Sequence, residues 1–178
     1  GRLGPVGAVL ARLGPAGLRR KMSDVKTEFL FEMEAELVEP ANFIGAMPEG
    51  TRLIANVKGG TFEGPALKGT IAPSGADWAL IRADGSLKID VRAVLIAEDG
   101  TQIYAYYGGR IVMPPEHIGA LGDRAKAAAL DPALYYFRTN PLFEVAMESP
   151  HAWLNGVVAV GMGRLTEKGV AYRVYKVL

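Results

Sequence analysis

The chain has 178 residues and a mass of 19.0 kDa, with 49% hydrophobic and 22% charged residues, which suits one globular domain with a sizeable core. It contains no cysteine, which excludes disulfides, thiolate metal sites and cysteine nucleophiles and fits a reducing, cytoplasmic location. Residues 1–21 hold five basic residues and no acidic one, so 15 basic and 19 acidic residues remain from Met22 onward. A body with a net charge near −4 is a poor electrostatic partner for DNA or RNA, and we expect no nucleic-acid partner.

Residues 1–26 are interpreted as a leader that lies outside the fold, and residues 27–178 as a single domain. Residues 1–21 of this leader are rich in arginine and lack acids, as weak targeting segments are, although Met22 also fits a natural start with upstream sequence before it. No apolar run reaches the ~20 residues that span a bilayer, so no membrane partner is expected.

The first predicted element of the domain is a strand at Thr27–Leu37, where apolar side chains alternate with glutamates. A period of two over this length is typical of a half-buried strand. A loop is expected from there through Pro40 to Gly50. Further strands are predicted at Arg52–Lys58, Ala66–Ala72, Trp78–Ala83, Ser86–Ala97 and Gln102–Gly108.

The dipeptides Asp84-Gly85 and Asp99-Gly100 each separate two alternating runs. Asp-Gly favours a two-residue hairpin turn because both residues accept a positive φ. Two successive hairpins predict an antiparallel meander from Trp78 to Gly108.

The region of residues 115–131 interrupts the strands, and its alanine-rich Asp123–Leu130 favours a short helical insertion. Strands resume at Leu134–Thr139, Leu142–Met147, Trp153–Gly163 and Val170–Val177. Sequential hairpins without crossover helices predict an all-β domain, and closure into an antiparallel β-barrel removes its edges. A two-sheet sandwich is the alternative.

The candidate catalytic residues are Asp90, Arg92 and Tyr104. Asp90 and Arg92 share one face of their predicted strand, where the guanidinium would offer donors to a carboxylate, enolate or phosphate. A surface salt bridge is the alternative. Pairing across Asp99-Gly100 would bring Tyr104 or Tyr106 close to Arg92, where a phenol donates to an oxygen developing negative charge, unless the tyrosines only pack.

The candidate substrate-binding residues are polar or aromatic side chains on or beside predicted strands. Trp78 would form the floor of a pocket or fill the core, with Asp77 next to it. An arginine or an amide inside a barrel orients a ligand or satisfies backbone groups. The set is Asp77, Trp78, Tyr106, Arg138 and Asn155.

Three chemistries are disfavoured by what the sequence lacks. The two histidines, His117 and His151, have no partner at helical spacing, so no metal site is expected. No G-x-S-x-G elbow appears, and the glycine pairs follow no nucleotide-binding spacing. We therefore expect no cofactor.

The sequence resembles the domain of unknown function 3237 family, also known as uncharacterised protein family 0311. The resemblance covers Thr27 to the C-terminus, and it rests on motifs that recur in this order. They are Gly59-Gly60 with Gly64-Pro65, Gly75-Ala76-Asp77-Trp78, Arg82 with Asp84-Gly85, Asp90-Val91-Arg92, Asp99-Gly100, Tyr136-Phe137-Arg138-Thr139 and Trp153-Leu154-Asn155. It implies a closed barrel similar to the allene oxide cyclase and dirigent barrels, which hold small organic molecules and steer cyclisation or coupling without a metal.

Three functions are left open. The first is a cofactor-independent isomerase, cyclase or lyase acting on a small molecule with a carbonyl or carboxylate oxygen, with Asp90 as base or as the group that orients Arg92. The second is a carrier or sensor, whose cavity would hold no carboxylate of raised pKa. The third is an interaction module with a filled barrel, no void above ~300 Å³ and an outward apolar face at Leu87–Leu95. A homo-oligomer, dimer or trimer, is expected.

Overall fold

The computed structural model describes residues 24–178, so the predicted leader at residues 1–26 lies outside the described residues except for its last three residues. The strands are β1 (Thr27–Leu37), β2 (Asn42–Met47), β3 (Gly50–Glu63), β4 (Lys68–Asp77), β5 (Leu80–Ile81), β6 (Leu87–Ala97), β7 (Gln102–Val112), β8 (Tyr136–Thr139), β9 (Leu142–Val145), β10 (Ala159–Leu165) and β11 (Gly169–Val177). The helical segments are η2 (Pro115–Gly122), α2 (Arg124–Ala128), η3 (Pro132–Leu134) and η4 (Ala152–Gly156). None of the helical segments in this range has the length and apolar character that a membrane crossing requires.

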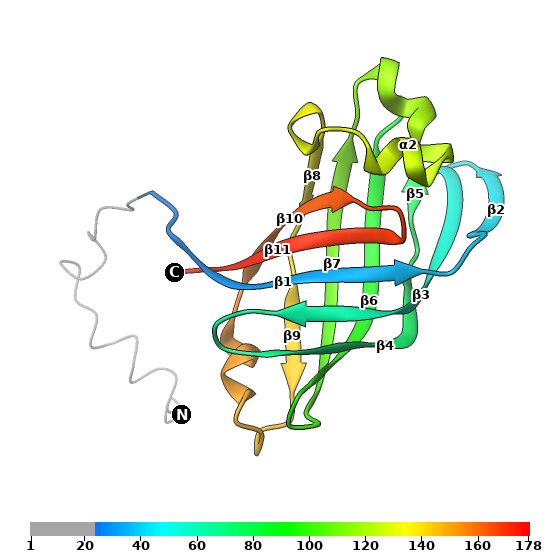
Figure 1. Ribbon diagram of the computed structural model, residues 1–178. Helices are drawn as coiled ribbons and strands as arrows, with labels where there is room; N and C mark the ends of the chain where they lie inside the picture. Colours follow the sequence, from blue (N-terminus) through cyan, green and yellow to red (C-terminus); the bar gives the residue numbers. More distant parts are fainter. Residues whose placement is uncertain (1–23) are drawn as a thin grey trace, which may run out of the picture.

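Eight strands close into an antiparallel barrel (Figure 1). Around the ring, β1 is followed by β3, β4, β6, β7, β8, β10 and β11, which pairs back with β1. Met33 of β1, for example, lies opposite Phe62 of β3 on one side and Tyr172 of β11 on the other. The predicted closed barrel with a helical insertion is confirmed, and the sandwich alternative is wrong.

Three strands are additions to the ring. β2 pairs with β3, β5 lies between β3 and β6, and β9 pairs with β7. Part of the predicted loop before Gly50 is therefore the strand β2. The predicted strand Trp78–Ala83 is reduced to Leu80–Ile81, since the chain leaves β4 only at Asp77.

Both predicted Asp-Gly hairpins are present. Gly85 and Gly100 have φ values of 80° and 83°, which glycine adopts readily, but Asp84 and Asp99 do not have a positive φ, so the expected two-residue turn is wrong. The N–H groups of Arg82 and Ala97 donate to the carbonyls of Ser86 and Thr101, and each turn is therefore a three-residue loop. Across these turns Ile81 lies opposite Leu87, and Ile96 lies opposite Gln102. The meander from β5 to β7 therefore has the predicted pairing.

The predicted strand Trp153–Gly163 is wrong in its first half, where the chain forms η4 and enters β10 only at Ala159. The Asn155 side chain explains this local structure. Its amide donates to the Val145 carbonyl at 2.9 Å, and its oxygen accepts from the Val145 N–H at 2.8 Å. The Asn155 side chain thus satisfies the backbone N–H and carbonyl of Val145 in β9, and its segment does not continue a strand.

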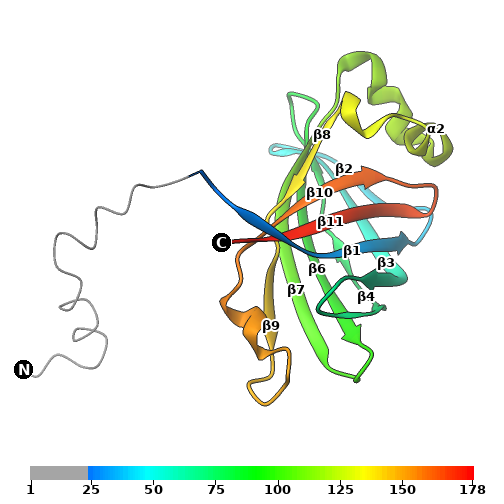
Figure 2. The same cartoon turned by 60° about the vertical axis from the view of Figure 1, so that its left-hand side comes forward.

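The two ends of the barrel are filled differently. Toward the end that carries η4, Phe31 packs edge to face on Phe62 and Phe143, with ring centroids 5.5 and 6.1 Å apart. The other end lies beneath η2 and α2, which stand over the barrel mouth in Figures 1 and 2. Space for a ligand is therefore expected below the helical insertion.

The inner and outer faces of β6 are clearly separated. Ile89, Val91 and Leu95 are buried in the core, so the apolar face of this strand points inward and not toward a subunit interface.

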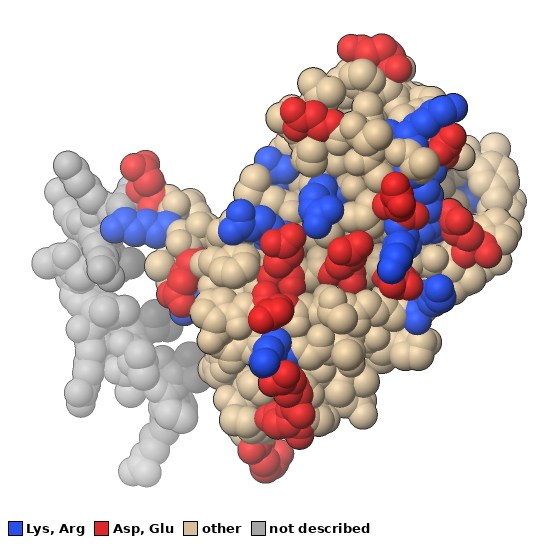
Figure 3. Space-filling view, in the orientation of Figure 1, with Lys and Arg blue, Asp and Glu red and all other residues tan. Residues whose placement is uncertain are grey.

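On the side of the barrel shown in Figure 3, basic and acidic side chains are intermingled. Several of them pair on β1, as Glu36 does with Lys58 and Lys168 at 3.6 and 3.3 Å.

Candidate functional site

A cavity of about 470 Å³ lies inside the barrel beneath the helical insertion, and we call it the inner cavity. Its wall is mostly apolar, with contributions from the inward faces of the ring strands and from η2 and α2. A volume of this size suits a small organic molecule. The lining residues are Ala35, Leu37, Leu53, Ala55, Val57, Asp77, Ala79, Ile81, Gly85, Leu87, Val91, Tyr107, Ile111, Ile118, Leu121, Gly122, Arg124, Ala127, Phe137, Leu165, Thr166, Gly169, Val170 and Tyr172.

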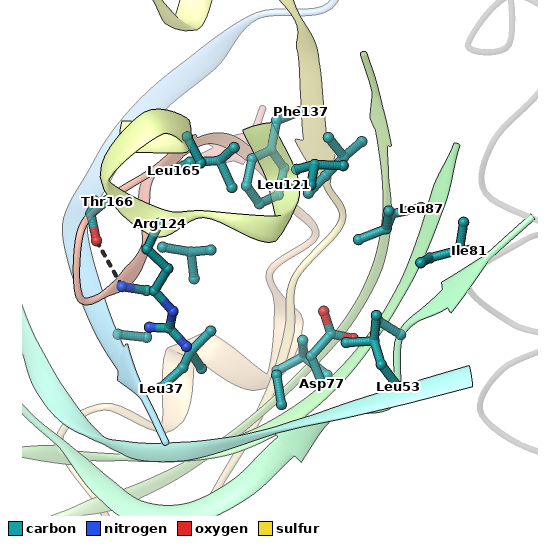
Figure 4. Close-up of a pocket in the computed structure, with 18 of the residues that line it drawn as sticks. Leu37, Leu53, Asp77, Ile81, Leu87, Leu121, Arg124, Phe137, Leu165 and Thr166 are labelled. Carbon is teal, nitrogen blue, oxygen red and sulfur yellow. Dashed lines mark hydrogen bonds between the residues drawn. The ribbon is translucent and has the colours of Figure 1, made fainter. Parts of the chain in front are cut away.

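Asp77 places a carboxyl group in this apolar wall. It ends β4 between Ala55 of β3 and Val91 of β6, both of which line the cavity too. Figure 4 shows its carboxyl group pointing into the cavity. The Asp90 N–H donates to Asp77 Oδ1 at 2.9 Å, which fixes the carboxyl group at the strand end.

Burial raises the pKa of Asp77 to about 6 from 3.8, because the charged form loses hydration. The hydrogen bond from the Asp90 N–H opposes this rise in the pKa, the negative charge of Asp90 adds to it, and Arg52 opposes it. A carboxyl group with such a pKa exchanges a proton near neutral pH. That is the property a general base or acid needs.

Two buried tyrosines share the cavity with Asp77. The rings of Tyr107 and Tyr172 meet edge to face with centroids 5.6 Å apart, and Phe137 packs on Tyr172 at 5.3 Å. Burial raises the pKa of both phenols far above the usual value, and the charge of Asp77 raises it further. Both therefore stay protonated and can donate hydrogen bonds to a ligand oxygen.

Arg124 of α2 brings a cation to the mouth of the cavity (Figure 4). Its guanidinium forms an ion pair with Glu39, which follows β1, and it donates to the Lys168 carbonyl at 2.6 Å, in the turn between β10 and β11. Asp123 caps the helix by accepting from the N–H groups of Ala125 and Lys126 at 3.1 and 3.2 Å. Arg124 thus fastens the helical insertion to two loops at the barrel rim.

The predicted pair Asp90 and Arg92 lies on the outer face of β6. Arg92 Nη1 stands 2.6 Å from Asp90 Oδ1, and the two side chains are 48% and 43% exposed. The predicted proximity is correct, and the pair is the surface salt bridge that was given as the alternative, so the catalytic position inside the barrel is wrong. Their strand turns Ile89 and Val91 inward, and residues of the opposite parity must therefore face solvent.

Tyr104 and Tyr106 also lie on the outer face, and their rings stack with centroids 5.5 Å apart. Arg92 lies opposite Tyr106 in the ladder, as the hairpin predicted. The Arg92 guanidinium also stands over the Trp78 ring at 5.5 Å, so Trp78 covers the outer wall and not the cavity floor. These residues form an arginine–aromatic cluster outside the barrel.

Arg138 and Asn155 do not line the inner cavity either. Arg138 points outward from β8, with its guanidinium 5.1 Å from the Tyr136 ring. Asn155 serves the backbone of β9, which is the alternative role considered for an amide in this barrel. Of the predicted site residues, Asp77 alone lines the inner cavity.

The sequence prediction missed Tyr107, Tyr172 and Arg124. A signal existed for the tyrosines, since Tyr107 shares strand parity with Ile103 and Ala105, and Tyr172 shares it with Val174. No comparable signal exists for Arg124, whose position depends on how the helical insertion folds back over the mouth. No cluster of three or more potential metal ligands occurs within residues 24–178.

Comparison with known proteins places the chain in a family. Residues 25–177 match the family described as protein of unknown function (DUF3237). A UPF0311 protein of Rhodopseudomonas palustris is 27% identical over 154 residues, which cover 86% of this chain and 97% of that protein. A crystal structure of a conserved protein of unknown function from that organism agrees with a TM-score of 0.80 over 88% of this chain and 99% of that chain.

Two further crystal structures share the fold. A β-barrel-like protein from Acinetobacter baumannii is 34% identical, with a TM-score of 0.76 over 90% of this chain and 100% of that chain. An enzyme from Penicillium herquei is 22% identical, with a TM-score of 0.62 over 88% and 96%, and shows likeness in fold alone. The family resemblance inferred from the motifs is confirmed, and the chain belongs to the DUF3237 family.

Proposed function

We propose that the protein binds a small, mostly apolar organic molecule with a carbonyl or carboxylate oxygen in the inner cavity, and that Asp77 performs acid–base chemistry on it. The observation that carries this proposal is a carboxyl group of pKa about 6 in an apolar cavity of about 470 Å³. The reaction would be a cofactor-independent isomerisation, cyclisation or elimination, in which the protein moves protons and stabilises charge.

The roles of the residues follow from their protonation. At pH 7 Asp77 is mostly ionised, so it accepts a proton from a carbon next to the ligand's carbonyl group. The electrons of that C–H bond form a C=C bond, the C=O π electrons move onto the oxygen, and a phenol of Tyr107 or Tyr172 donates a hydrogen bond to the developing oxyanion. Asp77, now protonated, returns the proton to another carbon in an isomerisation or to a leaving group in an elimination.

The alternative functions fit the cavity less well. A filled interaction module would have no void above ~300 Å³, whereas the inner cavity measures about 470 Å³. A pure carrier needs no carboxyl group of raised pKa, and an uncharged asparagine would occupy the same position without the cost of desolvating a charge. Both facts favour a reactive site over a passive one.

Binding is tested by native mass spectrometry of the protein mixed with extracted cellular metabolites. We expect a bound small molecule on the wild type and its loss from Ala79→Phe, because Ala79 lines the cavity and a benzyl group would fill it. Ala46→Phe is the matched control, since Ala46 is exposed on β2. Equal binding to wild type, Ala79→Phe and Ala46→Phe would show that the ligand lies elsewhere. The same spectra give the oligomeric state, for which we propose a dimer or trimer.

Catalysis is tested with the ligand so identified, by following its conversion by the wild type and by Asp77→Asn. The variant keeps an oxygen that accepts from the Asp90 N–H, so binding should persist while turnover is lost. Conversion by Asp77→Asn at the wild-type rate would remove Asp77 from the mechanism. Binding without conversion by the wild type would leave the carrier function.

A further inference from the structure

A row of three basic residues crosses the outer face of the barrel wall. Lys88 of β6 lies directly opposite Arg110 of β7, and Arg110 lies directly opposite Arg138 of β8. Adjacent strands are about 4.8 Å apart, so the three cations follow one another across neighbouring strands. We call these three residues the cationic row.

The cationic row has no acidic partner. Among residues 24–178, no carboxylate lies within 4.0 Å of Lys88, Arg110 or Arg138, whereas Arg92 and Lys68 each have one. Like charges directly opposite each other in a sheet are unfavourable, and here neighbouring carboxylates do not relieve this repulsion. A bound anion from outside the chain would relieve the repulsion.

The two arginines keep most of their donors for such an anion. Arg110 Nη1 donates to the Gly109 carbonyl at 2.7 Å, and Arg138 Nη1 donates to the Phe137 carbonyl at 2.8 Å. Each guanidinium has five N–H donors arranged in a fork that matches the oxygens of a carboxylate or phosphate. One bond to a carbonyl leaves that fork available.

The row lies beside a groove on the outer surface, with a volume of about 580 Å³. Arg110, Arg138 and Asn140 form its polar part, and Tyr136 and Val160 form its apolar part. Tyr136 is 51% exposed, and its ring is held beneath the Arg138 guanidinium at 5.1 Å. Gly108 carries no side chain to fill the groove, which we call the outer groove.

We propose that the outer groove binds a small anionic molecule in which a phosphate or carboxylate group is joined to a flat apolar group. The oxyanion would lie between Arg110 and Arg138 with Lys88 adding charge, and the apolar part would lie against Tyr136 and Val160. A small ligand fits better than a nucleic acid, because the chain from Met22 onward has a net charge near −4. The neighbouring Asp90–Arg92 pair is neutral in sum and does not extend the basic surface.

This site is separate from the inner cavity, although both use β7 and β8. Ile111 and Phe137, the sequence neighbours of Arg110 and Arg138, line the cavity on the other side of the wall. The two sites can therefore be tested independently, and failure of one does not affect the other.

The test is a titration of the isotope-labelled full chain with inorganic phosphate and with phenyl phosphate, followed by amide NMR shifts at constant ionic strength. We expect saturable shifts at Gly108, Gly109 and Asn140, with phenyl phosphate binding more tightly because its ring contacts Tyr136. Arg110→Gln with Arg138→Gln should weaken the binding roughly tenfold or more, since two charge-assisted hydrogen-bond donors are lost.

The matched control is Lys58→Gln with Lys68→Gln, which removes the same charge from lysines that have acidic partners. The control should bind phenyl phosphate as the wild type does. Shifts that do not saturate, or equal weakening in both double variants, would overturn the proposal. Anionic phospholipid vesicles form a third arm, and binding to vesicles without binding of either soluble phosphate would overturn it as well.

Discussion

Replacing Asp77 with asparagine should make the protein more stable at neutral pH, and the gain should vanish in acid. The carboxyl group of Asp77 has a pKa of about 6 in the folded protein against 3.8 as the ordinary value. Folding therefore favours the protonated acid and disfavours the carboxylate. A pKa raised on folding gives stability that is present below pH 3.8 and is lost as the pH rises to about 6.

The magnitude follows from the size of this shift. Each pH unit of difference corresponds to 1.36 kcal/mol, so ionised Asp77 costs the folded state about 3 kcal/mol above pH 6. Asparagine has nearly the same shape and keeps an oxygen for the Asp90 N–H, so it removes this cost without a cavity. Asp77→Asn should thus gain up to about 3 kcal/mol at pH 8 and little at pH 4.

The assay is urea unfolding of wild type and Asp77→Asn, followed by circular dichroism between pH 4 and pH 8. Only the difference between the two proteins is informative, because Asp84, Asp99 and Asp123 have lowered pKa values and change stability in the opposite direction. A difference that is constant across this pH range, or that favours the wild type at pH 8, would refute the reasoning about Asp77.

Two further changes test the packing and the mouth of the barrel. Gly163→Ala should cost about 1–3 kcal/mol of unfolding free energy, because its Cβ would lie 2.5 Å from the Phe137 ring, and urea unfolding measures it. Gly156→Ala, with nothing within 4 Å, is the control, and equal losses would contradict the steric argument. Arg124→Gln should speed amide hydrogen exchange across residues 115–134, since it removes the ion pair with Glu39; unchanged exchange would show that α2 is held by other contacts.

The fold was largely predictable because its signals are local. The alternation in Thr27–Leu37 sets β1 with the predicted bounds, and the two Asp-Gly turns set the pairing of β5, β6 and β7. The errors in the predicted strand bounds arise where long-range contacts override local turn signals. The strand predicted at Ala66–Ala72 was expected to end before Pro73, but β4 continues to Asp77 through a bulge, with a register shift against β6 between Ile71 and Gly75.

The site was less predictable because strand parity alone does not say which face is inside. Charged and aromatic residues such as Arg92 and Tyr104 predicted the site on one face of the meander, but that face is the outer wall of the barrel. The inner face looked like ordinary core, with Val91 and Tyr107 among aliphatic neighbours. The pairing of β7 with β8, β8 with β10 and β10 with β11 curves the sheet so that Tyr172 meets Tyr107 inside the barrel.

Asp77 lowers the stability of the folded protein and is also the residue that the proposed function requires. Charged residues in strands usually face solvent because burying a charge is costly, and Asp90 and Arg92 follow that rule. Asp77 departs from it, since it lies opposite the inward-facing Val91 in the ladder and its side chain therefore points into the barrel. Asparagine would keep the hydrogen bond without the cost of about 3 kcal/mol. Packing therefore does not explain why this position of an apolar cavity holds a carboxylate that lowers the stability of the folded protein. Proton transfer to a bound ligand would explain it.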